Sequence, residues 1–219
     1  MKEKRNTLQP GCDCNRFRTG QDMFFDNPGD TVSKPRLLLH SCCGPCSSAV
    51  IERLYPDFDL TVFFYNPCIT NREEYERRKA AQIQLINAMN LEICPGGNTI
   101  NFVEGDYEPE AYLSIVKGLE GAPEGGERCT LCFEMRLAKT AAYASASGYP
   151  LYATTLTVSP HKNYALITEI GKRYAAEYGI EYLDRDFKKK AGFQRSVQLS
   201  KQYGLYRQDY CGCDFSKRD

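Results

Sequence analysis

The stretch LLLHSCCGPCSSAVIERL, residues 37–54, decides the fold because it places a strand, a loop and a helix in direct succession. It opens with a short continuous apolar run of the kind that forms a buried strand. It closes with Ala49, Val50 and Leu54 at helical spacing, and Pro56 ends that pattern. The loop between the two elements contains three cysteines, Cys42, Cys43 and Cys46.

The alternation of strand and helix continues along the chain. Asn71 is a good N-cap and Glu74 can complete a capping box, so a helix is expected to begin there. Gly148 and Gly179 are natural stops for two later helices. Further strands are predicted over residues 60–66, 91–94, 150–157 and 180–184, and further helices over 108–119, 129–147 and 162–179. Repeated units of this length require crossover connections. They predict an α/β fold, a parallel sheet with helices on both faces, Rossmann-like or nucleotide-hydrolase-like.

A ligand site is expected at one edge of this sheet, because open parallel sheets bind their ligands at the carboxyl ends of the strands. The loop over residues 42–46 directly follows the first strand. Its thiols also face the positive end of the following helix dipole, which lowers their pKa and favours the thiolate that binds metals. We therefore expect a metal site at the carboxyl ends of the strands.

Length and charge restrict the domain organisation. The chain has 219 residues, which is enough for one sizeable core. Residues 1–35 are polar and interrupted by proline and glycine, so they are expected to form a flexible or loosely docked extension before a single catalytic domain over 36–219. The 28 basic and 28 acidic residues balance, so a polyanion would have to be bound by a local patch.

The interpretation of the cysteines depends on the cellular compartment of the protein. No stretch approaches the ~20 apolar residues needed to cross a bilayer, and the basic start MKEKRNTLQPGCDCNRF is followed by no hydrophobic segment. We therefore expect a cytoplasmic protein with no membrane partner. Because thiols are kept reduced there, the 11 cysteines indicate metal binding or redox chemistry rather than a disulfide scaffold.

Two cysteine clusters are expected to form one metal centre. Cys129 and Cys132, in RCTLCFEMRL, are one helical turn apart at the start of a helix, so both sulfurs can face the same centre. With Cys42 and Cys43 they offer four soft thiolates from two separate loops. Such a set suits zinc or an iron–sulfur cluster.

The other cysteines have different expected roles. Cys211 and Cys213, in DYCGCDFS, would form a strained and easily reduced bridge, and the glycine between them allows the required bend. We interpret them as a redox couple, with two free thiols at a frayed end as the alternative. The remaining four are expected to be packing residues, Cys68 and Cys94, or ligands of at most an adventitious metal, Cys12 and Cys14.

Eight motifs occur in order over nearly all of residues 37–216. They are HSCCGPC from residue 40, YNP from 65, EEYERR from 73, GDYEPEAY from 105, ERCTLCFEMRL from 127, TTLTVSPHKN from 154, FKKKAGFQRS from 187 and YCGCDFS from 210. Together they resemble the cobalamin-independent epoxyqueuosine reductases, the QueH family. This combination is far more specific than any single CxxC. The resemblance does not cover residues 1–35.

The resemblance implies the last step of queuosine biosynthesis. In that step the epoxide of a modified guanine at the tRNA wobble position is reduced to an alkene and water is released. The implied partners are tRNA carrying epoxyqueuosine, with His, Asn, Asp or Tyr acceptors, and an electron donor of unspecified identity. Cys68 departs from the family pattern, in which Asn is expected at this position.

The resemblance also implies roles for individual cysteines. A 4Fe–4S cluster is implied, and a second metal beside it, mononuclear iron or zinc, would use Cys46 as an extra ligand. The family's redox-active pair corresponds to Cys211 and Cys213. The implied cluster ligands are Cys42, Cys43, Cys129 and Cys132.

Substrate contacts are suggested by position and charge. His161 and Lys162 follow a predicted strand end and are candidate substrate contacts, as is Glu127. Candidate tRNA contacts are Lys188, Lys189, Lys190 and Arg195, with Arg77 and Arg78 next. Tyr203, Tyr206 and Tyr210 could stack on unpaired bases. A solvated charged face and core tyrosines are the alternative interpretation of these residues.

Two other functions are compatible with parts of the pattern. An iron–sulfur tRNA thiolation enzyme would need a Gly- and Ser-rich pyrophosphate loop such as SGGxDS, but HSCCGPCSS has thiols where the phosphate-binding glycines would be. ATP dependence is therefore not expected. A noncatalytic metal-binding or electron-carrier protein would bind the metal but consume no epoxide.

Overall fold

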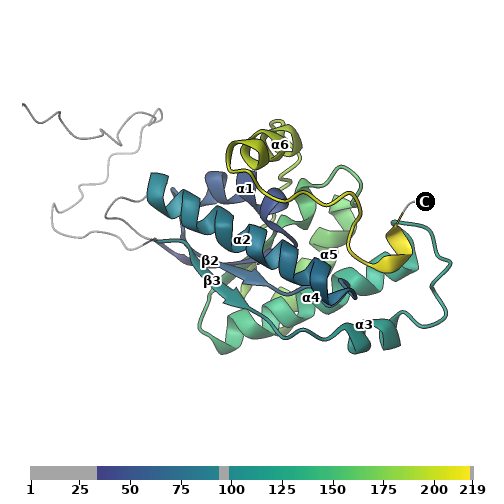
Figure 1. Ribbon diagram of the computed structural model, residues 1–219. Coiled ribbons are helices and arrows are strands. Elements are labelled where there is room, and N and C mark those ends of the chain that lie inside the picture. The colour runs from purple at the N-terminus through teal and green to yellow at the C-terminus, as the bar shows by residue number, and fades with distance from the viewer. Residues whose placement is uncertain (1–33, 94–98, 218–219) are drawn as a thin grey trace, which may run out of the picture. The chain divides into compact units, whose positions relative to one another are not determined.

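Five parallel strands form the central sheet in the computed structural model, which describes residues 34–93 and 99–217 (Figure 1). Their order across the sheet is β3-β2-β1-β4-β5, and every neighbouring pair is parallel. The strands are β1 (Arg36–Ser41), β2 (Asp59–Phe64), β3 (Asn101–Glu104), β4 (Leu151–Thr154) and β5 (Glu181–Tyr182). The predicted α/β fold with a parallel sheet is confirmed.

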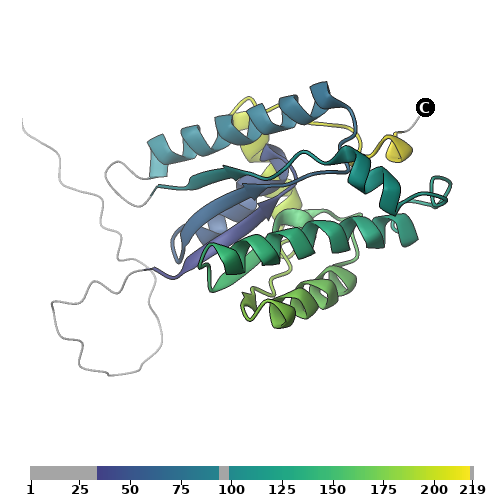
Figure 2. The same ribbon diagram turned by 90° about the horizontal axis from the view of Figure 1, so that it is seen from below.

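Helices cover both faces of the sheet (Figure 2). Leu37 and Leu39 point to the face covered by α1 and α2, whereas Leu38 points to the face covered by α4 and α5, as the two-residue period of a strand requires. Helix α6 packs beside α1. The helices are α1 (Gly44–Leu54), α2 (Arg72–Ile93), α3 (Pro109–Ile115), α4 (Glu127–Ala146), α5 (Tyr164–Glu177) and α6 (Gly192–Gln202). Two short 3-10 helices are η1 (Thr155–Val158) and η2 (Asp214–Ser216).

The strand order places a topological switch point between β1 and β4. The chain moves outward from β1 to β2 and β3 on one side, and the remaining strands β4 and β5 lie on the other. Connections that diverge on either side of two strands leave a crevice at their carboxyl ends, where ligands bind. The loop after β1 contains Cys42 and Cys43, and η1 follows β4.

Several local predictions agree with the structure. Asn71 caps α2, since its Oδ1 accepts a hydrogen bond of 2.9 Å from the backbone N–H of Glu74. Gly148 and Gly179 follow α4 and α5 with φ of 70° and 67°, the left-handed conformation that glycine adopts at little cost. The predicted capping box is wrong, because the Glu74 carboxylate accepts hydrogen bonds from Arg78 and Tyr206 and not from the backbone N–H of Asn71.

Two strand predictions need correction, and one helix was missed. Residues 91–93, expected in a strand, form the last turn of α2, and the strand lies at β3, where Phe102 pairs with Val62. The predicted strand over 150–157 ends at Thr154, whose side chain caps the turn of η1. Helix α6 was not predicted at all. It begins after two residues in the left-handed conformation, Lys190 and Ala191, which propensity does not anticipate.

Residues 1–33 lie outside the described residues, so the predicted extension, Cys12 and Cys14 stay predictions, as does Cys94. Residues Lys34–Asp219 form one compact unit. Over 34–93 and 99–217, no helix combines the length and the apolar character needed to cross a membrane.

Candidate metal centre

The three cysteines after β1 form a tight group. Cys43 is the N-cap of α1, with Pro45 in the first helical turn, so the chain turns from strand to helix within the cysteine motif. Gly44 is required there, because a Cβ at this position would lie 2.6 Å from the backbone oxygen of Ala81 in α2. The sulfurs of Cys42, Cys43 and Cys46 lie within 4.8 Å of one another.

The group is arranged to carry negative charge on one sulfur. The thiols of Cys43 and Cys46 donate toward Cys42 and hold its pKa well below the usual range. Hydrogen bonding to Cys42 raises the pKa of Cys43 to about 12, and Cys46 is likewise raised. One thiolate flanked by two thiols is a set of soft donors from which a metal ion displaces protons.

Polar side chains from other elements orient these sulfurs. Thr155, the first residue of η1, donates through its hydroxyl to Cys42 Sγ at 3.6 Å and accepts from the Cys42 backbone N–H at 3.3 Å. Gln208 Nε2 donates to Cys43 Sγ at 2.8 Å. The loop after β1, the turn after β4 and the C-terminal segment therefore meet at this group.

Cys129 and Cys132 lie in the first turns of α4, as predicted, and belong to a second set of thiols. Cys132 is buried beside Cys68, and donation from the Cys132 thiol lowers the pKa of Cys68 to about 6. These residues line one cavity together with Cys211 and Cys213. Cys129 and Cys132 are not part of the 4.8 Å group, but Cys42 and Cys129 pack against the same core cluster.

A second cavity adjoins the first and has a volume of about 240 Å³. Cys42 and Cys46 line it, together with Phe193 and Tyr210. Cys211 lines both cavities and therefore lies between the two sets of thiols. His161 and Lys162 also line both, so the residues predicted to follow a strand end do reach this crevice.

A buried arginine lies behind the thiols. Arg136 is 2 % exposed, and its guanidinium donates to Asn66 Oδ1 at 2.6 Å and to Cys132 Sγ at 3.9 Å. Burial alone would lower its pKa, but the sulfurs of Cys68, Cys132 and Cys42 raise it. Arg136 is therefore a permanent positive charge that offsets the charge of thiolate ligands.

His40, at the end of β1, completes this buried layer. Its Nδ1 is 2.8 Å from Thr154 Oγ1, and its Nε2 is 3.1 Å from the Tyr65 carbonyl oxygen. Burial and the adjacent Arg136 lower the pKa of His40 to about 3, so its imidazole is neutral. A neutral ring adds no second positive charge behind the sulfurs.

The basic residues predicted to contact tRNA do not line either of the two thiol cavities. Lys189 and Lys190 line a different cavity, and Arg195 forms an ion pair of 2.6 Å with Glu52. Lys188 Nζ donates a hydrogen bond to the backbone oxygen of Lys162 and so helps to fix the position of that residue. Glu127 is the first residue of α4.

One of the predicted tRNA contacts is wrong. Arg78 is 1 % exposed and therefore not available to a tRNA phosphate, whereas its neighbour Arg77 is exposed. Three residues that sequence reasoning did not assign to the site also contribute to it: Arg136 and Gln208, which were given no role, and Cys68, which was assigned to packing. For Arg136 and Cys68 the available signals were the arginine four positions after Cys132 and the cysteine in NPCI.

Known proteins resemble this chain over most of its length. The sequence model described as "Epoxyqueuosine reductase QueH" matches residues 37–219. A protein of that name from Streptococcus pyogenes serotype M1 is 43 % identical over 218 residues, which is 100 % of this chain and 84 % of that protein. Namesakes from Staphylococcus epidermidis and Thermotoga maritima are 42 % and 36 % identical, over 84 % and 82 % of this chain and 76 % and 89 % of their own lengths. Two sets of thiols at the switch point of a parallel sheet, in a chain matched over this length, show that the protein belongs to the epoxyqueuosine reductase QueH family.

Proposed function

We propose that this protein reduces the epoxide of epoxyqueuosine in tRNA to the alkene of queuosine. The reaction consumes two electrons and two protons per epoxide and releases the oxygen as water. The observation that carries the proposal is the position of Cys211, which lines both the cavity beside Cys42 and Cys46 and the cavity beside Cys129 and Cys132. A redox-active thiol in that position adjoins both a metal site and space for a substrate.

The thiols fit an iron–sulfur centre in type and charge. Soft sulfur donors, one of them already a thiolate, lie around a buried guanidinium that offsets anionic charge. We assign the cluster to Cys42, Cys43, Cys129 and Cys132, and a second iron or zinc to the neighbourhood of Cys46. When bound, a 4Fe–4S cluster supplies electrons one at a time and a second metal supplies Lewis acidity.

The chain's own residues prepare the cavity for the substrate. Lys162 lies in the wall shared by the two cavities. Burial lowers the lysine pKa, but the negative charges that Cys211, Cys42 and Cys46 carry as thiolates raise it above its usual value. Its ammonium keeps a positive charge where an epoxide oxygen gains negative charge. Phe193 and Tyr210 offer aromatic surface against which a modified base can pack.

Cys211 and Cys213 are assigned as a redox pair. Both are free thiols in this structure. Oxidation of two thiols to one disulfide releases two electrons and two protons, the number that opening and removing the epoxide consumes. An external electron donor then returns the pair to the dithiol.

The tRNA around the modified nucleoside needs contacts beyond the cavity. After Arg78 is removed from the set, the candidates that remain are the exposed Lys189, Lys190 and Arg77 and the partly exposed Lys188 and Arg195. Contacts of this kind bind phosphates without regard to sequence. The acceptor identities named for the family, His, Asn, Asp and Tyr, are part of this proposal.

The proposal is tested on protein purified without oxygen. Iron and acid-labile sulfide content, the EPR spectrum after dithionite reduction and conversion of epoxyqueuosine in tRNA are measured on one sample. Cys213→Ser is expected to abolish turnover while the cluster absorbance stays intact. Zinc without a cluster and no conversion would overturn the proposal. ATP-dependent tRNA thiolation would instead favour the thiolation enzyme, and metal without epoxide consumption would favour an electron carrier.

A further inference from the structure

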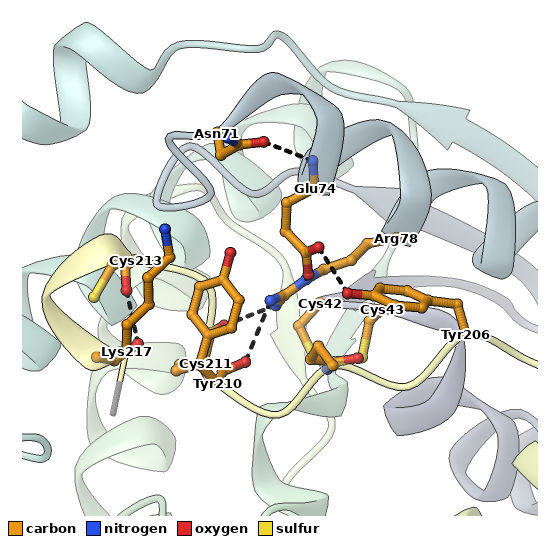
Figure 3. A network of polar contacts seen from close by, with 12 residues as sticks. Cys42, Cys43, Asn71, Glu74, Arg78, Tyr206, Tyr210, Cys211, Cys213 and Lys217 are labelled. Carbon is orange, nitrogen blue, oxygen red and sulfur yellow. Dashed lines mark hydrogen bonds and ion pairs between the residues drawn. The ribbon is translucent and has the colours of Figure 1, made fainter. Parts of the chain in front are cut away.

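The C-terminal segment over residues 206–216 brings Cys211 and Cys213 to the thiol cavities. It contains little regular structure apart from η2. Its position therefore depends on contacts with other elements. Figure 3 shows these contacts converging on Arg78 of α2, which lies between Glu74 and the backbone of the segment.

Arg78 binds the segment through two backbone carbonyl groups. Its Nη1 donates to the Cys211 oxygen at 3.0 Å and its Nη2 donates to the Tyr210 oxygen at 3.2 Å. Its Cζ is also 4.9 Å from the centre of the Tyr210 ring. A planar guanidinium can make all these contacts at once, which an ammonium cannot.

The other side of Arg78 is held by a buried acid. Nε donates to Glu74 Oε1 at 2.6 Å, and Tyr206 donates to Glu74 Oε2 at 2.8 Å. Glu74 and Arg78 are 7 % and 1 % exposed. A buried charge pair of this kind is costly to break from one side, so Glu74 fixes the orientation of the guanidinium that binds the segment.

Gly212 fits against this guanidinium. It has φ of 125°, a conformation that side chains rarely adopt. A Cβ at Gly212 would lie 2.9 Å from Arg78 Nη1 and 3.0 Å from Ile69 Cγ1. The glycine between the two cysteines is therefore needed for close approach to Arg78 as well as for the bend.

Other contacts hold the chain after the pair. Thr70 donates to the Asp214 carboxylate, and the guanidinium of Arg128 lies 5.3 Å from the centre of the Phe215 ring. Cys213 is 6 % exposed, and its neighbours include Tyr112. Arg78 thus holds the part of the segment that contains Cys211, while other residues hold the part after Cys213.

We propose that Arg78 is a positioning residue that fixes Cys211, and with it the Cys211–Gly212–Cys213 segment, against the thiol cavities. The role in turnover rests on the proposed function, whereas the positioning rests on these contacts alone. The buried pair of Glu74 and Arg78 is thus assigned to the redox segment rather than to tRNA binding.

The test compares thiol reactivity in the full-length protein purified without oxygen. Arg78→Gln is expected to raise the rate of iodoacetamide alkylation at Cys211 by about tenfold or more, since two hydrogen bonds from a charged donor are lost. The rate at Cys213 is expected to rise less, and the buried Cys68 is expected to stay protected. Each cysteine is quantified by peptide mass spectrometry.

Arg72→Gln is the matched control. Arg72 and Glu76 form an ion pair of 2.6 Å on the same helix with the same i,i+4 spacing, but Arg72 is 62 % exposed and its pair lies at the surface. This variant is expected to leave alkylation and turnover unchanged. Arg78→Lys is expected to restore the protection of Cys211 from alkylation only in part, because lysine keeps the positive charge but lacks the planar guanidinium that donates to two carbonyl groups. Full rescue would show that the positive charge alone holds the segment, and a Cys211 alkylation rate in Arg78→Gln equal to wild type would overturn the positioning role.

Two further outcomes decide the proposal. If Arg78→Gln also exposes Cys68, the chain has loosened globally, and Gly212→Ala decides instead: faster labelling confined to Cys211 and Cys213 supports positioning, and unchanged labelling overturns it. If the wild-type protein converts epoxyqueuosine, the Arg78→Gln variant is expected to have a lower kcat and an unchanged KM for tRNA. Absence of conversion in wild-type protein would reject the proposed function but leave the labelling result to decide the role of Arg78.

Discussion

The buried guanidinium of Arg136 shows how one side chain prepares a site for an anionic ligand set. Two unit charges about 4 Å apart at an effective dielectric constant of ~20 interact by about 4 kcal/mol. Arg136 Nη1 is 3.9 Å from Cys132 Sγ, and the adjacent His40 is neutral. The positive charge behind the sulfurs therefore comes from a group that cannot lose its proton.

Arg136→Met is expected to weaken metal retention about 10- to 100-fold, the usual effect of removing a group that supports metal ligands. Iron and sulfide per chain after anaerobic reconstitution and a chelator challenge would measure this. The control is Arg173→Met, because Arg173 forms an exposed ion pair with Glu134 on the same layer of helices. Retention equal to wild type in Arg136→Met would show that the charge is not required.

Individual site residues were predictable where the residue type itself specifies the chemistry. The spacing of Cys42, Cys43 and Cys46 indicated soft ligands, and these sulfurs do form a group. Arg78 was misassigned because an arginine in a helix suggests a surface cation, and only its tertiary surroundings reveal that it is buried. Cys68 was assigned to packing because a lone cysteine is commonly a core residue. It is buried as expected, but its thiol also contacts Cys132.

Helices and strands were predictable where local signals and packing agree. The apolar run of β1 and the Asn71 cap of α2 are such cases. The end of α2 is the opposite case: Leu91 looks like part of a strand but is 81 % exposed, because helical hydrogen bonding continues past the last residue that packs. Helix α6 begins at Gly192, where a Cβ would lie 1.8 Å from the Phe187 backbone oxygen, so the start of this helix requires a glycine that helix propensity does not favour.

The contact between α1 and α2 allows a test of packing at the cysteine loop. Gly44→Ala is expected to destabilise the protein by about 1–3 kcal/mol, because its Cβ would collide with the backbone of Ala81, which cannot move independently of α2. Urea unfolding gives the change. Gly121→Ala is the control, since a Cβ there meets nothing within 4 Å. Equal stability of Gly44→Ala and wild type would show that the two helices separate without cost.

The location of the site follows from the sheet as a whole. The order β3-β2-β1-β4-β5 makes the ends of β1 and β4 neighbours, and this is why the loop with Cys42 and the turn with Thr155 meet although 113 residues separate them. Alternating elements predicted the parallel sheet. They did not predict the order of its strands, which depends on which crossovers pack on each face.

Several buried tyrosines make the stability of the fold depend on pH in the alkaline range. Tyr152 is fully buried and donates to the Gly171 oxygen at 2.7 Å, and burial raises its pKa. Burial raises the pKa of Tyr65, Tyr75 and Tyr182 in the same way. Below about pH 10 these tyrosines are neutral in both the folded and the unfolded chain, so their ionisation does not reduce the free energy of unfolding. Above it the unfolded chain loses protons first, and the free energy of unfolding falls as pH rises toward the folded pKa values.

Tyr152→Phe separates the hydrogen bond from this proton linkage. At pH 8 the variant is expected to be less stable by about 1 kcal/mol, because the Gly171 oxygen loses its donor. Between pH 10 and 11.5 its unfolding free energy should fall less steeply than that of wild type, by up to about 1.4 kcal/mol per pH unit, the value for one proton. Urea midpoints across pH 8 to 11.5 with thiols kept reduced measure both effects, and cysteine ionisation cancels in the comparison. Parallel curves for the two proteins would mean that Tyr152 ionises equally in the folded and unfolded chains, and that its burial does not contribute to alkaline unfolding.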